Sequence, residues 1–139
     1  MSDTDPPLTD FASLLVLAYK QEEPQRMLFV FARKELPEHA SIGQRERFNN
    51  GEGGGLRPCL CVDKALEEIS SFESLVAESA ATGQSWDVAF VGCLAGRGGI
   101  PPNPDEADYP LRLMVNAINN GRVSDLAAFD RNGRALRFI

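Results

Sequence analysis

The sequence lacks an apolar run long enough to cross a membrane. Its longest apolar stretches, residues 14–18 and 88–94, are much shorter than the roughly 20 residues that a membrane-spanning helix needs. The first residues are acidic and contain two prolines, whereas a secretory signal begins with positive charge and continues with an apolar segment. We therefore expect a cytoplasmic protein that makes no contact with a membrane.

Histidine and cysteine are scarce. The one histidine is His39, in a polar stretch, and the three cysteines are Cys59, Cys61 and Cys93. An odd number of cysteines, in a chain large enough to fold without cross-links, indicates reduced thiols. Cys59 and Cys61 would face the same side of a strand, and the set lacks the paired spacing of a zinc site. We expect buried, unreactive thiols, no metal and no other cofactor; a redox pair is the less favoured alternative.

Basic residues are outnumbered by acidic ones. The 14 lysines and arginines stand against 20 aspartates and glutamates, which gives a formal net charge of -6. Nucleic-acid affinity depends on cationic contacts with phosphates, so this balance disfavours nucleic acid as a partner. The charge is also uneven, because residues 63–87 hold six acids and one lysine, whereas residues 109–139 hold five arginines and two aspartates. Such asymmetry could orient a partner, although solvated helix faces produce it equally well.

Length and local patterns predict one α/β domain over residues 1–139, with residues 1–7 disordered. Helical spacing of apolar residues predicts one helix behind Thr9 and Asp10 and another behind a capping box of Ser70 and Glu73. A third helix opens among residues 105–110, and a short one follows Ser41. Nearly continuous apolar runs predict buried strands at residues 26–33, 56–62 and 86–94.

Strands that alternate with helices favour parallel neighbours joined by right-handed crossovers. Near the end of the chain, Asn132-Gly133 predicts a tight hairpin turn between residues 123–129 and 135–139. We therefore expect a mixed sheet of four to five strands with flanking helices and a C-terminal β-hairpin, although a two-layer arrangement remains open. Residues 28–31 and 88–91 should lie in adjacent or near-adjacent buried strands.

The loops after the first three strands are the candidate ligand site, because open α/β sheets bind ligands beyond the carboxyl ends of parallel strands. If these strands are parallel neighbours, the polar groups of the three loops line one rim and could bind a phosphate or carboxylate. The alternative is that charged residues end strands where the chain meets solvent. The candidate residues are Arg33, Lys34, Asp63, Lys64, Gly96, Arg97, Gly98 and Gly99.

Neither glycine-rich segment completes a nucleotide-binding motif. In the segment that starts at Gly96, Pro101 occupies the position of the third glycine, and the acidic start of the next helix would repel a pyrophosphate. Residues 51–55 are not followed by Gly-Lys-Ser/Thr, which favours a flexible connector. Arg97 is the first residue to test as an anion ligand, and an ion pair with one of Asp105, Glu106 or Asp108 is its alternative role.

Five segments carry a resemblance to a known family. Residues 24–32, 61–64, 86–91, 96–99 and 129–133 are similar to a family of small proteobacterial proteins of uncharacterised function. Some members of that family are labelled ribonucleotide reductase subunit alpha. The resemblance covers most of the chain, from about the first helix to the C-terminus, and implies a bacterial protein. It assigns no catalytic residue to this sequence.

Two functional hypotheses follow. The favoured one is a cytoplasmic bacterial protein that acts as a non-catalytic accessory or protein-binding domain. The alternative is a binder of, or an enzyme acting on, an anionic metabolite or nucleotide at the strand-end rim. The expected partner is accordingly a protein or a small anionic ligand. The sequence leaves open whether the chain is an enzyme and which residues would be catalytic.

Overall fold

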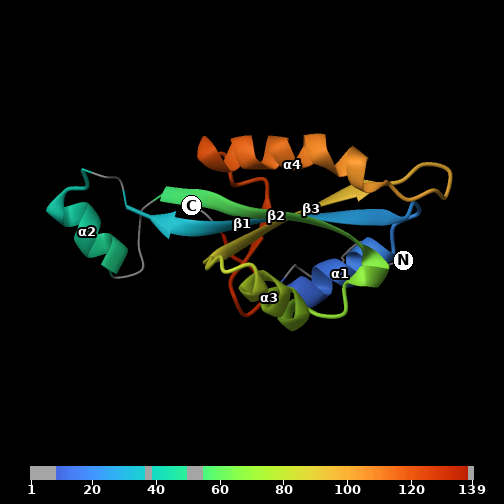
Figure 1. Cartoon of the computed structure of the whole chain (residues 1–139), viewed down its shortest axis with the longest axis horizontal. Coiled ribbons are helices and arrows are strands. Elements are labelled where there is room, and N and C mark those ends of the chain that lie inside the picture. Colours follow the sequence, from blue (N-terminus) through green and yellow to red (C-terminus); the bar gives the residue numbers. More distant parts are fainter. Residues whose placement is uncertain (1–8, 37–38, 50–54, 138–139) are drawn as a thin grey trace.

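The computed structural model describes residues 9–36, 39–49 and 55–137 (Figure 1). The expected disorder of residues 1–7 and most of the connector at residues 51–55 lie outside these ranges. None of the described helices is long and apolar enough to span a bilayer. The elements, in order, are α1 (Phe11–Tyr19), β1 (Gln25–Glu35), α2 (Ile42–Asn49), β2 (Gly55–Ala65), the short 3-10 helix η1 (Leu66–Glu68), α3 (Phe72–Ala81), β3 (Val88–Ala95), α4 (Pro104–Asn119) and β4 (Ala127–Phe129).

The four strands form one sheet in the order β2-β1-β3-β4, and every described ladder is antiparallel. Val30 of β1 lies opposite Cys61 of β2 on one side and opposite Phe90 of β3 on the other. The expectation that residues 28–31 and 88–91 form adjacent buried strands is therefore confirmed. The expectation of a mixed sheet with parallel neighbouring strands is wrong.

The physical reason for the antiparallel order lies in α2, which cannot act as a crossover helix. A crossover helix must bury an apolar face against the sheet, but the side chains described in α2 are all exposed, and Ile42 is 78% exposed. Figure 1 shows α2 beyond the end of the sheet, where it covers neither face. Strands β2 and β3, which α3 connects, do run in the same direction, but β1 is inserted between them.

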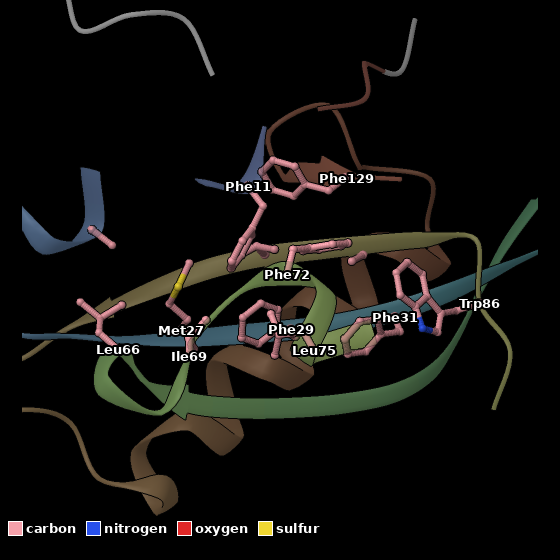
Figure 2. Packing of buried hydrophobic residues seen from close by; sticks show 13 residues of the cluster. Phe11, Met27, Phe29, Phe31, Leu66, Ile69, Phe72, Leu75, Trp86 and Phe129 are labelled. Carbon is pink, nitrogen blue, oxygen red and sulfur yellow. The ribbon is translucent and has the colours of Figure 1, made fainter. Parts of the chain in front are cut away.

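Helices cover both faces of the sheet, because successive side chains of β1 point to opposite sides. Met27, Phe29 and Phe31 point toward α1 and α3, where they join the aromatic cluster in Figure 2. The intervening residues of β1 belong to a second cluster with Met114 and Ile118 of α4. The arrangement therefore has three layers rather than two, with a separate core on each side of the sheet.

The helix ends follow local capping, with one boundary shifted from its prediction. Asp10 caps α1 as expected, because its Oδ1 accepts a hydrogen bond of 2.8 Å from the Ser13 backbone N–H. The cap of α3 is Ser71, which pairs with Ser74, so the predicted Ser70 and Glu73 box is wrong by one residue. Only Ser70 and Glu73 fit the Ser-x-x-Glu pattern, but Ser71 has the extended backbone of an N-cap, and the Ser74 hydroxyl takes the part of the glutamate.

The C-terminal hairpin forms only in part. The chain reverses after β4, but the returning arm makes the isolated bridge between Phe129 and Ala135 instead of a second strand. Within this turn only Gly133 has a positive φ, +80°, whereas a two-residue type I′ turn needs positive φ at Asn132 as well, so the expected turn at Asn132-Gly133 is wrong. The Oδ1 atom of Asp130 accepts hydrogen bonds from the backbone N–H groups of Asn132 and Arg134 instead. This carboxylate stabilises a wider turn.

We predict that Ser79→Ala destabilises the fold by about 1–3 kcal/mol, the cost of leaving a buried donor without its partner. The indole N–H of Trp86 donates a 2.8 Å hydrogen bond to Ser79 Oγ, and both residues are buried. Urea unfolding measures the change. Ser70→Ala, at an exposed serine near the start of the same helix, is the control and should shift stability by less than about 0.5 kcal/mol. Equal effects of the two changes contradict the role of this hydrogen bond.

Candidate functional site

The predicted anion rim is divided between the two ends of the sheet. Because β1 runs antiparallel to β2 and β3, its carboxyl end lies opposite to theirs. Arg33 and Lys34 therefore lie at one end, and Asp63, Lys64 and residues 96–99 lie at the other. The premise of a single rim is wrong; the second group shares one end of the sheet, but Asp63 and Lys64 lie on opposite faces of β2.

The first end contains a buried arginine nitrogen and a nearby carboxylate. The Lys34 backbone N–H donates to Asp87 Oδ2 at 2.8 Å, which places a carboxylate beside this end of β1. The Nε atom of Arg33 is buried and has no hydrogen-bond partner among the described residues. The Arg33 charge also acts on the thiol of Cys59, whose pKa burial raises and Arg33 lowers. An acidic neighbour at this end weakens its attraction for an anion.

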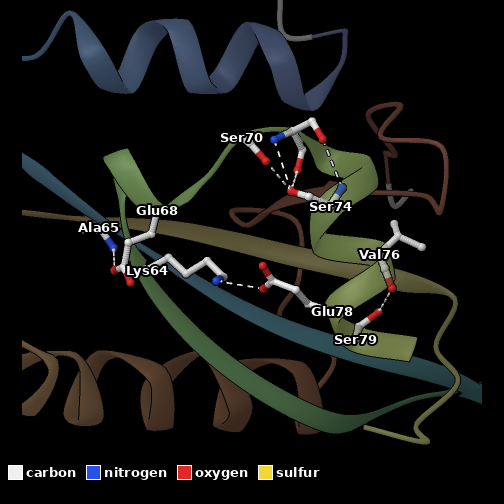
Figure 3. A network of polar contacts seen from close by, with 9 residues as sticks. Lys64, Ala65, Glu68, Ser70, Ser74, Val76, Glu78 and Ser79 are labelled. Carbon is white, nitrogen blue, oxygen red and sulfur yellow. Dashed lines mark hydrogen bonds and ion pairs between the residues drawn. The ribbon is translucent and has the colours of Figure 1, made fainter. Parts of the chain in front are cut away.

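At the second end, the two charged candidates are already paired within the chain. Asp63 Oδ2 accepts from both Nε and an Nη atom of Arg26 at 2.6 Å. Lys64 Nζ lies 2.8 Å from Glu78 Oε2, and Figure 3 shows the lysine side chain reaching from β2 toward α3. Both pairs fix side chains between neighbouring elements, so neither charge faces solvent without a partner of opposite sign.

The glycine loop is a tight turn with a carboxylate of the same chain bound to it. Arg97 and Ile100 exchange backbone hydrogen bonds, and Gly98 and Gly99 between them have φ of +57° and +81°, as a type I′ turn requires. The N–H groups of these two glycines donate to the two carboxylate oxygens of Glu23, at 3.1 Å and 2.7 Å. Glu23 therefore takes the donors that an anionic ligand was expected to use.

The predicted roles of Arg97 are not supported by this geometry. Its side chain is exposed, at the edge of the turn. Glu106, one of its expected partners, instead completes the cap of α4 by accepting from the Asn103 backbone N–H at 3.1 Å. Whether Arg97 or the other candidate residues bind an anion stays a prediction.

A cavity of about 430 Å³ lies beside this end of the sheet, but its charge is unfavourable for an anion. The carboxylates of Glu22, Glu23 and Glu67 line it, together with a single arginine, Arg26. That arginine is paired with Asp63. The net negative lining therefore opposes the anionic ligand that the sequence predicted.

A second cavity, which sequence reasoning missed, lies between the edge strand β2 and α3. Its volume is about 180 Å³, and buried Phe31 and Leu75 contribute to its lining. Leu60 and Val62 of β2 are half-buried and line it from the strand side, while exposed residues of α3 and its C-cap, including Glu78, complete it. We call this cavity the β2–α3 groove. The alternation of Leu60 and Val62 was visible in the sequence, but their exposure depends on β2 being an edge.

The thiols are more exposed than the sequence predicted. Cys59 is half-buried, but Cys61 and Cys93 are exposed, so the expectation that they are buried is wrong for two of the three. Cys61 lies on the edge strand, and Cys93 lies beyond the residues of β3 that β4 covers. All three are free, and the protein atoms around each sulfur raise its pKa by desolvation.

No family model, no curated protein and no solved structure matches this chain. The resemblance to the proteobacterial family therefore stays a hypothesis, and the geometry alone guides the functional proposal. In the part of the chain that the structure describes, no three metal-ligating side chains gather into one group.

We predict that Gly96→Ala destabilises the protein by about 3 kcal/mol, the upper range for forced overpacking. A Cβ atom on Gly96 would lie 2.1 Å from the carbonyl oxygen of Ile100, and Gly96 is itself held by a hydrogen bond to Pro24. Thermal unfolding measures the loss. Gly43→Ala is the control, because the nearest atom to its added Cβ is 3.9 Å away and α2 gains helix propensity. An unchanged melting temperature for Gly96→Ala would disprove the close approach.

We predict that all three thiols alkylate more slowly at pH 7 than the thiol of free glutathione. Their raised pKa leaves a smaller thiolate fraction at any given pH, and the thiolate is the reactive species. Rates should therefore rise with pH over the alkaline range. Iodoacetamide labelling followed by mass spectrometry resolves the individual sites. Labelling faster than that of glutathione, or a disulfide between Cys59 and Cys61, contradicts this expectation.

Proposed function

We propose that this chain is a non-catalytic accessory domain of the bacterial cytoplasm that binds another protein through the open edge of β2 and the β2–α3 groove. The observation that carries the proposal is this combination of an edge strand and an apolar cavity beside it. An unpaired edge offers a row of backbone N–H and C=O groups that another chain can use. A neighbouring pocket for alternate side chains supplies specificity in binding by strand addition.

The binding zone is the second half of β2. In the first half, Pro58 has no backbone N–H and so offers one donor fewer. There is also a β-bulge at Cys59: Phe31 pairs with Leu60 and the next residue of β1, Ala32, pairs with Pro58, which leaves Cys59 without a partner in the register. A proline and a bulge are features that protect an edge from pairing. Residues 60–65 have neither feature, and the groove lies against this half of the strand.

The alternative function, a binder or enzyme for an anionic metabolite, has less support. At the end of the sheet where most candidate residues gather, Glu23 engages the turn N–H groups, and Asp63 and Lys64 have intramolecular partners. The backbone edge of β2 has no such partner strand among the described residues. We therefore favour protein binding over binding of a small anion.

The test is affinity capture from the source cells with the wild type and two matched variants. Leu60→Asp places a charge in the groove wall, whereas Val16→Asp places the same charge on α1, where Val16 is 53% exposed. We expect a defined partner on the wild type and on Val16→Asp, and loss of that partner on Leu60→Asp.

Circular dichroism must show that Leu60→Asp remains folded, and if it does not, Leu60→Ala replaces it and should retain less partner than the wild type. Equal capture by the wild type and a folded Leu60 variant would refute the proposed surface, as would the absence of any partner on the wild type.

A further inference from the structure

Resting on the proposed function, we propose that the partner contributes a basic, extended segment, which adds to the sheet beside residues 60–65 and places an aliphatic side chain in the β2–α3 groove. The proposed occupant is thus an extended, positively charged segment of a partner protein, and not a folded surface or a second copy of this chain. The backbone edge, the groove and the surrounding charge each define one property of that segment.

The backbone edge sets the length and conformation of the segment. The six residues from Leu60 to Ala65 extend over about 20 Å at roughly 3.3 Å per residue. They pair with β1 along one side only, and no second strand among the described residues covers their other side. The Ala65 N–H at the end of this stretch already donates to Glu68 Oε1 at 2.9 Å, so the edge open to a partner segment is chiefly residues 60–64. Only an extended backbone can hydrogen-bond with successive N–H and C=O groups along such an edge. The partner segment must therefore be extended where it binds.

The groove sets the side-chain pattern. Leu60 and Val62 lie opposite Phe31 and Phe29 of β1, on the sheet face that carries α3. An added strand would place every second side chain on that same face, over the groove. The buried Phe31 and Leu75 make this site apolar, which favours an aliphatic residue there. The intervening side chains would point to the other face, where Cys61 and Asp63 lie.

The charge of the chain near the groove determines which charge the partner segment should carry. Residues 63–87, which comprise the end of β2, η1, α3 and the approach to β3, hold six acids and one lysine. That lysine, Lys64, is neutralised by Glu78, whose side chain is 54% exposed at the groove. Figure 3 shows this pair spanning from β2 to α3. The net negative potential attracts a basic segment and speeds its encounter with the edge.

The same charge disfavours a second copy as the occupant. Each copy has a net charge of -6, and pairing of two β2 edges would bring the acidic region of one copy against that of the other. The unprotected edge is also only six residues long, which is short for an interface of about 1,600 Å², the usual size of a stable complex.

The experiment uses the full chain and fluorescein-labelled peptides, with binding followed by anisotropy. The probe has six central residues in which valine alternates with threonine, flanked by two lysines at each end. One control peptide carries glutamates in place of the lysines. A second control carries N-methyl groups on alternate backbone nitrogens, which removes strand donors while retaining the side chains. We expect the lysine probe to bind, and both controls to bind at least tenfold more weakly.

Two variants on α3 form the matched pair. Glu78→Lys reverses the charge at the groove, whereas Glu73→Lys makes the same change on the same helix at a residue that lines a different cavity. We expect Glu78→Lys to weaken binding of the lysine probe at least fivefold and Glu73→Lys to change it less than twofold. Leu60→Asp, or Leu60→Ala if the former does not fold, should weaken binding as well.

Several outcomes would overturn the inference. Equal weakening by the two α3 variants would indicate nonspecific charge attraction, and equal binding of the N-methylated peptide would exclude strand addition. A wild-type dimer in sedimentation that Leu60→Asp abolishes would identify a second copy as the occupant. If the lysine probe fails while cellular capture still depends on Leu60, this inference falls and the proposed function stands. If capture is independent of Leu60, the proposed function itself falls.

Discussion

Strand β1 is the element on which the positions of the others depend, because it is hydrogen-bonded along both edges and covered on both faces. Residues 27–32 are all buried, and their side chains alternate between two separate cores. Burial of about six such side chains is a major part of the driving force for folding. It also requires a strand on each side of β1 and a helix layer over each face. Strand β2 is consequently an edge, with a groove beneath α3.

Local patterns in the sequence were enough to locate most elements of this fold. The helices α1 and α4 and the strands β1 and β3 were predicted within a few residues, because helical spacing, capping and continuous apolar runs are properties of short segments. The direction of neighbouring strands is not such a property. It depends on whether the intervening helix can pack on the sheet, and the polar sequence of α2 from Ile42 to Asn49 was the available signal that it cannot.

The candidate site was harder to predict, because its decisive contacts join distant segments. Glu23 reaches the turn at Gly98 and Gly99 from 75 residues earlier in the chain. Adjacent glycines indicate an accessible backbone, but they do not reveal which acceptor occupies it. The β2–α3 groove likewise combines β1, β2 and α3. Pro58 is typical of an edge strand, yet the consequence for Leu60 and Val62 required the strand order.

If the open edge of β2 binds a partner as proposed, the distribution of charge would let it discriminate between partners. An exposed strand attracts any extended chain, including other copies of the same protein, unless something opposes the unwanted pairings. In this chain Pro58 and the bulge at Cys59 protect half of the edge, and the chain that follows the other half, residues 63–87, holds six acids and one lysine. Specificity is a difference between affinities, so a repulsion that acts on acidic segments and spares basic ones is as effective as an added contact. The acidic residues around β2 would therefore both disfavour self-association and select the partner.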